Sequence, residues 1–228
     1  NTIAGVASFG GKAAYMGKVA DDALGQFFRK ETVELGVTFR STPFVGGPAT
    51  ARSIIIVTPD AQRSMNTYLG CTPYLTPADI DKELVQASAI TYLEGYLFDR
   101  EDAKAAFVQA AEHARAAEKK VALTLSDSFC VDRHRESFHH LVNNHVDILF
   151  ANEAEITSLY ETDYDSALDA VQYRAPLVCV TRSEKGSTII VNGQHLHIDA
   201  YPTKVVDTTG AGDQYAAGFL FGLARGKS

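Results

Sequence analysis

The chain has 228 residues, of which 46% are hydrophobic and 21% are charged, a composition that excludes a disordered or fibrous protein. Its formal net charge of -7 at pH 7 argues against nucleic-acid binding, which requires a positively charged surface. No apolar run approaches the roughly 20 residues that a membrane-spanning helix needs.

The chain opens on a segment with helical character, residues 1–7, and it has no initiator methionine. It stops at Ser228, directly after a second helical segment. An α/β domain rarely begins on a helix with no strand before it. We therefore expect the sequence to be a piece of a longer protein that lacks both native termini.

Two β-rich segments, residues 50–58 and 63–69, follow the flexible Gly46-Gly47-Pro48. The turn-forming residues Pro59–Gln62 join them, which predicts a β-hairpin. Such a hairpin can stand outside the main sheet as a cover or form an antiparallel edge of that sheet, and the sequence alone leaves both possibilities open. We take residues 37–70 as a small β lid, and residues 1–36 with 71–228 as one α/β domain.

From Lys82 onward, short strand-like segments alternate with longer helical ones. Thr76-Pro77-Ala78-Asp79 has the pattern of a capping box with an early proline and predicts that a helix begins there. The alternation predicts βαβ units and a mostly parallel central sheet covered on both faces, a three-layer α/β fold in which ligands bind beyond the carboxyl ends of the strands. The predicted helices are 76–87, 102–118, 133–143, 153–160 and 165–173, and the predicted strands are 89–93, 121–125, 147–151 and 177–181.

The strongest local pattern is a glycine turn near the end of the chain. A strand at Val205-Val206 is expected to lead through Gly210-Ala211-Gly212-Asp213 into a helix over residues 216–224. The amides of residues 210–213 would be the free donors of a helix N-terminus, which favours a bound anion. The carboxylate of Asp213 could accept a proton from an attacking hydroxyl, or it could simply cap the helix. The residues alone leave both roles open.

The string Asp207–Asp213 resembles a signature of the ribokinase-like (PfkB) family of carbohydrate and nucleoside kinases. Gly17–Gly25 is similar to the N-terminal signature of that family, with Ala20 in place of a glycine. Asn152–Glu155 matches its Asn-x-x-Glu motif. The three matches occur in the order of the family, so the resemblance implies a ribokinase-like fold and an ATP-dependent kinase that phosphorylates a hydroxyl group.

In this family the resemblance makes Asp213 the catalytic base. It makes Gly210, Ala211 and Gly212 the anion hole for the transferring phosphoryl group. Thr208 and Thr209, directly before the glycines, are assigned to the nucleotide.

The resemblance assigns Asn152 and Glu155 to Mg²⁺-ATP. They stand three residues apart at a helix start, so they share one face, and both offer the oxygen ligands that magnesium prefers. The implied contact to Mg²⁺ runs partly through water. The alternative is an asparagine cap with a glutamate in the first turn, a frequent helix start.

The segment Thr181–Gly186 resembles the nucleotide loop of the family, usually Thr-x-Gly-x-x-Gly. Ser183 stands at the first glycine position, whereas Gly186 is present. Arg182 or Lys185 would offset phosphate charge. The alternative is a polar turn between two strands.

The segments 59–70 and 92–97 most resemble those of adenosine kinases within the family, which implies adenosine as the acceptor. The resemblance places Tyr96 and Phe129 against the purine, where stacking is worth ~1–3 kcal/mol per base; the alternative for both is core packing. It also assigns Asn66 to the substrate, and Asn1 matches the asparagine of the substrate motif Gly-Gly-x-x-x-Asn.

Two other functions stay open. One is a fructokinase or ribokinase that acts on a free sugar, and the other is a non-catalytic nucleotide-binding module. The expected ligands are ATP, Mg²⁺ and a small-molecule substrate, with no nucleic acid and no membrane, and the expected assembly is a monomer or homodimer. Three widely spaced cysteines fit neither a zinc site nor a disulfide framework, which favours the cytoplasm.

Overall fold

The computed structural model describes residues 1–59 and 63–227, so most of the predicted turn Pro59–Gln62 lies outside the described residues. The chain forms two compact units. The first comprises Asn1–Asp79 and the segment from Thr203 onward, and the second comprises Ile80–Pro202. This division differs from the predicted separation of residues 37–70, which stays a prediction.

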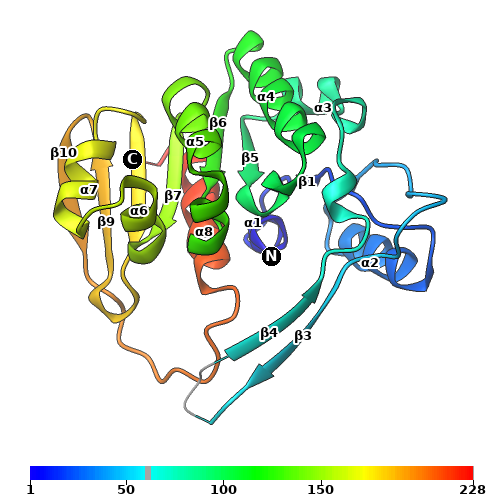
Figure 1. Ribbon diagram of the computed structural model, residues 1–228, viewed down its shortest axis with the longest axis horizontal. Helices are drawn as coiled ribbons and strands as arrows, with labels where there is room; N and C mark the ends of the chain where they lie inside the picture. Colours follow the sequence, from blue (N-terminus) through cyan, green and yellow to red (C-terminus); the bar gives the residue numbers. More distant parts are fainter. Residues whose placement is uncertain (60–62, 228) are drawn as a thin grey trace. The chain divides into compact units, whose positions relative to one another are not determined.

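The second unit contains a six-stranded sheet with the order β10-β9-β8-β7-β6-β5 (Figure 1). Strands β5 to β8 are parallel, and β9 and β10 continue the sheet in antiparallel fashion. The expected mostly parallel sheet is therefore confirmed. The strands are β5 (Ile90–Glu94), β6 (Lys120–Thr124), β7 (Ile148–Asn152), β8 (Leu177–Thr181), β9 (Ser187–Val191) and β10 (Gln194–Ile198).

Helices α4 to α7 connect the parallel strands and cover one face of this sheet (Figure 1). Helix α4 presents small side chains to the sheet, with Ala103, Ala106, Ala110 and Ala114 all 2% exposed or less. Their spacing of three and four residues puts them on one stripe, so the helix can approach the strands closely. The helices of this unit are α3 (Lys82–Ala87), α4 (Glu101–Ala116), α5 (Ser128–Asn144), α6 (Glu153–Tyr160) and α7 (Tyr164–Val171).

The first unit is built around helices α1 (Thr2–Ser8) and α8 (Ala211–Ala224). Gly5 of α1 faces α8 so closely that a Cβ atom there would lie 2.7 Å from the Cβ of Ala217. The unit also contains α2 (Ala23–Glu34) and a short parallel pair, β1 (Ala14–Tyr15) with β2 (Thr38–Phe39). Three aromatic rings pack edge to face between α2 and this pair: Tyr15, Phe28 and Phe39.

The predicted hairpin is confirmed as β3 (Arg52–Val57) and β4 (Arg63–Tyr68), which pair antiparallel from Arg52 with Tyr68 to Val57 with Arg63. Within the described chain these strands form a separate two-stranded sheet, so the alternative of an edge of the main sheet is wrong. Every residue of both strands is exposed. Its action as a lid stays a prediction.

Two predicted helix starts are wrong. A 3₁₀ turn (Pro77–Asp79) follows Thr76, and α3 begins only at Lys82, after Asp81 accepts a hydrogen bond from the Leu84 amide. Helix α5 begins at Ser128 instead of residue 133, because Asp127 accepts a hydrogen bond from the Phe129 amide at 2.7 Å and caps it early.

The strand expected at Val205-Val206 is also wrong. These residues are 54% and 74% exposed and belong to no strand. A β-branched pair needs a neighbouring strand for its hydrogen-bond ladder, and the described residues provide none here.

Among the residues that the structure describes, every helix is too short or too polar to span a bilayer.

Gly25 provides a test of packing in the first unit. It lies in the first turn of α2, where a Cβ atom would approach the Ala20 carbonyl oxygen to 2.0 Å. We expect Gly25→Ala to lower the free energy of unfolding by roughly 1–3 kcal/mol in urea denaturation, because the backbone must move. As a control, Gly218→Ala places a Cβ atom 4.0 Å from Phe9, its nearest neighbour. It should leave stability unchanged or raise it by up to ~1 kcal/mol. Equal stabilities for the two variants would contradict this packing.

Candidate active site

The glycine turn before α8 is stabilised by hydrogen bonds among the residues that form it. Gly210 is the N-cap residue with φ 77°, a left-handed conformation that favours glycine. One carboxylate oxygen of Asp207 accepts hydrogen bonds from the Thr209 amide at 2.8 Å and the Thr209 hydroxyl at 2.7 Å. These bonds hold the pKa of Asp207 below its usual value. The turn is thus an Asp-Thr-Thr-Gly structure that forms locally.

Asp213 lies in the first turn of α8 and does not cap the helix, because Gly210 occupies the cap position without a side-chain cap bond. Instead, its Oδ2 atom accepts a hydrogen bond of 2.8 Å from the Asn1 side chain, 212 positions away in the sequence. The capping alternative is therefore wrong for Asp213. The structure brings together a residue assigned to catalysis and one assigned to the substrate.

The anion hole predicted from residues 210–213 is partly occupied by an internal bond. The Ala211 amide donates to the Thr208 carbonyl at 3.1 Å. The amides of Gly212 and Asp213 have no partner within the part of the chain that the structure describes. A Cβ atom at Gly212 would meet nothing within 4 Å, so the space beside its backbone is open. Two free amides at a helix N-terminus are suited to an anion.

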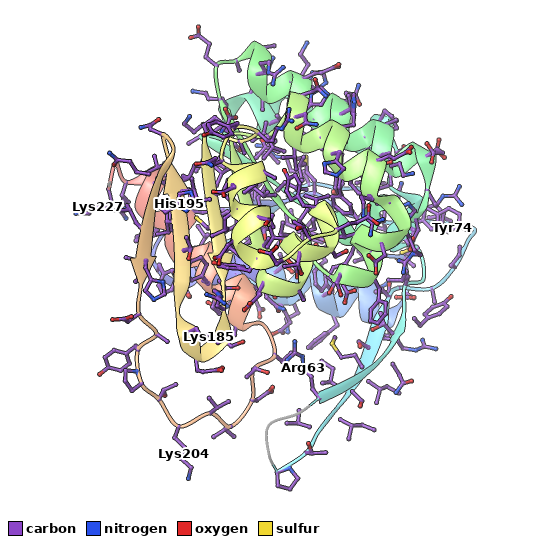
Figure 2. The ribbon with its side chains drawn as sticks, turned by 60° about the vertical axis from the view of Figure 1, so that its left-hand side comes forward. Arg63, Tyr74, Lys185, His195, Lys204 and Lys227 are labelled. Atoms are coloured by element: carbon purple, nitrogen blue, oxygen red, sulfur yellow. The ribbon has the colours of Figure 1, made fainter. Side chains whose placement is uncertain are left out.

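Arg63 also belongs to this region, and sequence reasoning missed it. Its guanidinium donates a hydrogen bond of 2.6 Å from Nη1 to the Thr208 hydroxyl, which brings a positive charge from strand β4 to the glycine turn (Figure 2). Alternation along β4 places Arg63 and Met65 on one face of the hairpin and Asn66 on the other. Asn66, predicted to contact the substrate, thus points away from the face that meets the turn.

In the second unit, Asn152 and Glu155 form a complete capping box at the start of α6. The Asn152 side chain accepts from the Glu155 amide at 2.9 Å. The two carboxylate oxygens of Glu155 accept from the backbone and side-chain nitrogens of Asn152, at 3.0 and 2.7 Å. Glu155 is 6% exposed, and burial raises its pKa to about 7. The structure thus contains the helix cap that was the alternative to magnesium binding for these two residues.

The same two residues offer a chemically suitable donor set for a hydrated magnesium ion. Their side-chain oxygens already accept hydrogen bonds, but each oxygen keeps a second lone pair for a water molecule. Magnesium retains most of its waters and binds through few protein groups. The described residues contain no cluster of three or more His, Cys, Asp or Glu that could hold a metal directly. Asn152 and Glu155 therefore fit a magnesium ion that they contact through water molecules.

The predicted nucleotide loop follows β8 and has a strained backbone. Ser183 adopts φ 52°, a left-handed conformation that favours the glycine which the resemblance leads us to expect at this position. Gly186 has φ 82°, and a Cβ atom there would lie 2.0 Å from the Ile198 carbonyl oxygen. Arg182 donates two hydrogen bonds to Glu153, whereas Lys185 lies at the same end of the sheet (Figure 2).

The two aromatic residues assigned to the substrate are exposed. Tyr96 lies in a 3₁₀ turn, η3 (Gly95–Asp99), directly after β5 and is 48% exposed. Phe129 lies in the first turn of α5, which follows β6, and is 73% exposed. Because β5 and β6 are parallel neighbours, both residues follow the same edge of the sheet. The core-packing alternative is therefore wrong for both.

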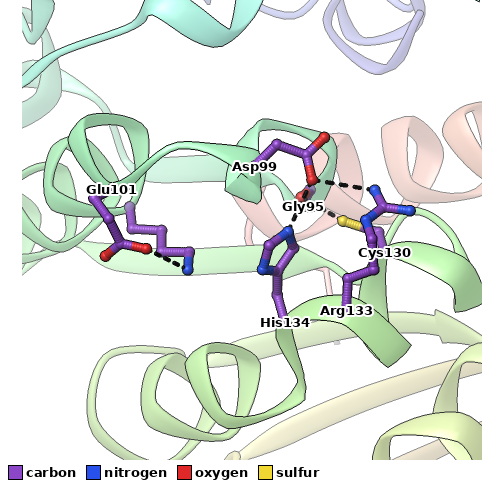
Figure 3. A network of polar contacts seen from close by, with 7 residues as sticks. Gly95, Asp99, Glu101, Cys130, Arg133 and His134 are labelled. Carbon is purple, nitrogen blue, oxygen red and sulfur yellow. Dashed lines mark hydrogen bonds and ion pairs between the residues drawn. The ribbon is translucent and has the colours of Figure 1, made fainter.

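Polar contacts join the segments that carry these aromatic residues (Figure 3). Asp99, at the end of η3, is hydrogen-bonded to His134 of α5 at 2.8 Å and to Arg133 at 3.2 Å. The Cys130 thiol donates to the Gly95 carbonyl at 3.1 Å. The turn after β5 is thus fixed to the helix after β6.

Comparison with known proteins connects these features to a family. A family model described as pfkB family carbohydrate kinase matches residues 1–228. The solved structure of adenosine kinase from Sinorhizobium meliloti is 50% identical, with a TM-score of 0.96, and the match covers 100% of this chain and 71% of that one. A probable sugar kinase from Rhizobium etli is 45% identical, with a TM-score of 0.97, over 100% of this chain and 70% of that one. The expected ribokinase-like fold is confirmed.

A relative with lower sequence identity is a sugar kinase by name. Fructokinase-2 of Solanum lycopersicum is 25% identical over 231 residues, which covers 96% of this chain and 70% of that protein. The similar proteins therefore include both nucleoside and sugar kinases.

Burial of Glu155 predicts a pH-dependent stability. Its pKa rises from 4.5 to about 7 on folding, so between these values the folded protein keeps a proton that the unfolded chain has released. The contribution of Glu155 to the free energy of unfolding is fully present below pH 4.5. It is lost as the pH rises from there through about 7. Urea denaturation in metal-free buffer should show wild type losing up to about 3 kcal/mol relative to Glu155→Gln as the pH rises across this window. A pH-independent difference would contradict a carboxyl group whose pKa is raised by burial.

Proposed function

This chain belongs to the PfkB family of carbohydrate kinases, and we propose that it transfers the γ-phosphate of ATP to the 5′-hydroxyl of adenosine, with Asp213 as general base. Members of this family are phosphotransferases that use ATP and act on hydroxyl groups of sugars or nucleosides. A binding-only module is therefore no longer a competing function. The observation that carries the proposed role of Asp213 is its hydrogen bond to Asn1 beside the N-terminus of α8.

The Asn1 amide engages Oδ2 of Asp213, so the carboxylate is oriented and its Oδ1 atom is left for the acceptor hydroxyl. In the proposed step the hydroxyl oxygen bonds to the γ-phosphorus while its proton passes to Asp213. The bond from the γ-phosphorus to the bridging oxygen breaks, and ADP leaves. The free amides of Gly212 and Asp213 then stabilise the charge of the transferring group.

Arg63 adds a positive charge next to the glycine turn through its hydrogen bond to Thr208. The Thr208 hydroxyl accepts from Arg63 of β4, and the Thr209 hydroxyl donates to Asp207 within the turn. We therefore assign both threonines to shaping the loop around the phosphates. Gly210 supplies the left-handed conformation on which the turn depends.

In the second unit, Asn152 and Glu155 are proposed to position Mg²⁺-ATP through water. A bound magnesium ion supplies neutralisation of phosphate charge. The role of this chain is to hold the two side chains in one arrangement, which the capping box does. The segment Thr181–Gly186 is proposed to contact the nucleotide through its backbone.

Adenosine as the acceptor is supported by the exposed rings of Tyr96 and Phe129 and by 50% identity to an adenosine kinase. Flat apolar faces suit a purine, because stacking gives a large contact area without hydrogen-bond readout. A sugar kinase is the second candidate, and the observations that favour it are the identity to a probable sugar kinase and the relation to fructokinase.

Removing one ring tests the substrate. Tyr96→Ala or Phe129→Ala should raise the KM for adenosine by about 5- to 150-fold, the equivalent of ~1–3 kcal/mol of stacking, and leave the KM for ATP nearly unchanged. Tyr173→Ala is the matched control, since Tyr173 is 82% exposed in the same unit but is assigned to no ligand. If all three variants behave alike, the rings do not bind the base.

Removing the base tests the chemistry. Asp213→Asn should lower kcat by ~10²–10⁴, because the amide keeps the shape and the bond to Asn1 but cannot take the proton. ATP affinity and folding should change little. Asn1→Ala, which leaves the carboxylate in place, should lower kcat by a smaller factor. An Asp213→Asn variant with near-normal kcat and reduced stability would make Asp213 a structural residue.

A further inference from the structure

The nucleotide loop after β8 is joined to the start of α6 by an ion pair that has no assigned role. Arg182 donates from Nε and Nη2 to the two carboxylate oxygens of Glu153, at 3.0 and 2.9 Å. This is the bidentate geometry in which a planar guanidinium is held most firmly by a carboxylate. Both side chains are partly shielded, with 23% and 39% of their surfaces exposed.

The aromatic ring of Tyr164 packs against one face of the same guanidinium. The Arg182 guanidinium carbon lies 3.9 Å from the ring centroid of Tyr164, within the range of a cation–π contact. The Tyr164 hydroxyl donates to the hydroxyl of Thr188, a buried residue of β9, at 2.9 Å. Arg182 is thus fixed by residues from α6, α7 and, through Tyr164, β9.

The ion pair spans the two segments that are proposed to handle the nucleotide. Asn152 and Thr181 are register partners at the ends of the parallel strands β7 and β8. Glu153 follows the first, directly inside the capping box, and Arg182 follows the second. Within the loop, the Arg182 amide donates to the Gly186 carbonyl at 2.8 Å, so a displacement of Arg182 also displaces the closing residue.

We propose that Arg182 is a positioning residue and not a phosphate ligand: its pair with Glu153 fixes the nucleotide loop relative to the start of α6. Two of its three guanidinium nitrogens are committed to Glu153, and one face is covered by Tyr164. Its charge is also neutralised by the carboxylate. Lys185, which has no ion-pair partner among the residues described, is the cation of the loop that remains for phosphate.

The two roles for Arg182 predict opposite effects of Glu153→Gln. If Arg182 binds phosphate, loss of the competing carboxylate frees it, and nucleotide affinity stays constant or increases. If it positions the loop, Glu153→Gln and Arg182→Gln should each weaken binding of a non-hydrolysable ATP analogue by roughly 5- to 20-fold in calorimetry without acceptor. The double variant should then be no weaker than either single one, because both remove one contact.

Lys185→Gln is the matched control in the same loop. Lys185→Gln leaves the bidentate pair between Arg182 and Glu153 intact, so its effect on affinity should appear on top of that of Arg182→Gln. Arg182→Lys keeps the charge but cannot form the bidentate pair, so it should bind the analogue as weakly as Arg182→Gln. Near-wild-type affinity of Arg182→Lys together with tighter binding by Glu153→Gln would overturn the proposal.

Hydrogen exchange of the ligand-free protein gives a second readout that is independent of activity. In both single variants the amides of residues 183–186 should exchange faster than in wild type. The charge-swapped double variant Glu153→Arg/Arg182→Glu should recover part of the protection. Unchanged exchange in the single variants would show that the pair does not fix the loop.

Discussion

The close approach of α1 to α8 determines where the proposed base lies. Gly5 has no side chain, and a Cβ atom there would lie 2.7 Å from Ala217 of α8. This contact lets Asn1, at the start of α1, reach Asp213 and donate a hydrogen bond of 2.8 Å. The left-handed turn at Gly210 sets the direction of the same helix start. The orientation of the carboxylate and the position of the free amides therefore depend on one tight contact between helices and one glycine turn.

Within the second unit, the residues proposed to position the nucleotide are held by hydrogen bonds to each other. Glu155 accepts two hydrogen bonds from Asn152, and Glu153 accepts two from Arg182. A capping box and magnesium binding do not exclude each other at these residues. The carboxylate that completes the cap still has lone pairs for water, so a rigid cap is compatible with a hydrated ion. We propose that the cap supplies the preorganisation that a weakly held ion requires.

Local patterns made most of the second unit predictable. The strand Leu177–Thr181 and the helix Glu153–Tyr160 have the predicted bounds, because each pattern ends at an unambiguous signal. The predicted strand at Val205-Val206 is wrong, since β-branched residues form a strand only beside another. Roles that depend on contacts between residues distant in the sequence could not be predicted from it. Arg63 is hydrogen-bonded to Thr208, 145 positions away, and Arg182 to Glu153, 29 positions away. The face of β4 that carries Asn66 followed only from the observed register.

Similar proteins include both sugar and nucleoside kinases, and we propose that this chain is specialised for a nucleoside. The proposal rests on the exposed rings of Tyr96 and Phe129 at the edge of one sheet, whose segments η3 and α5 are held together by polar contacts. The most direct test is kcat/KM for adenosine, fructose and ribose, measured by ADP release at saturating Mg²⁺-ATP. We expect a preference for adenosine of at least about 100-fold, because purine stacking has no counterpart in a free sugar. A preference for fructose or ribose would contradict it.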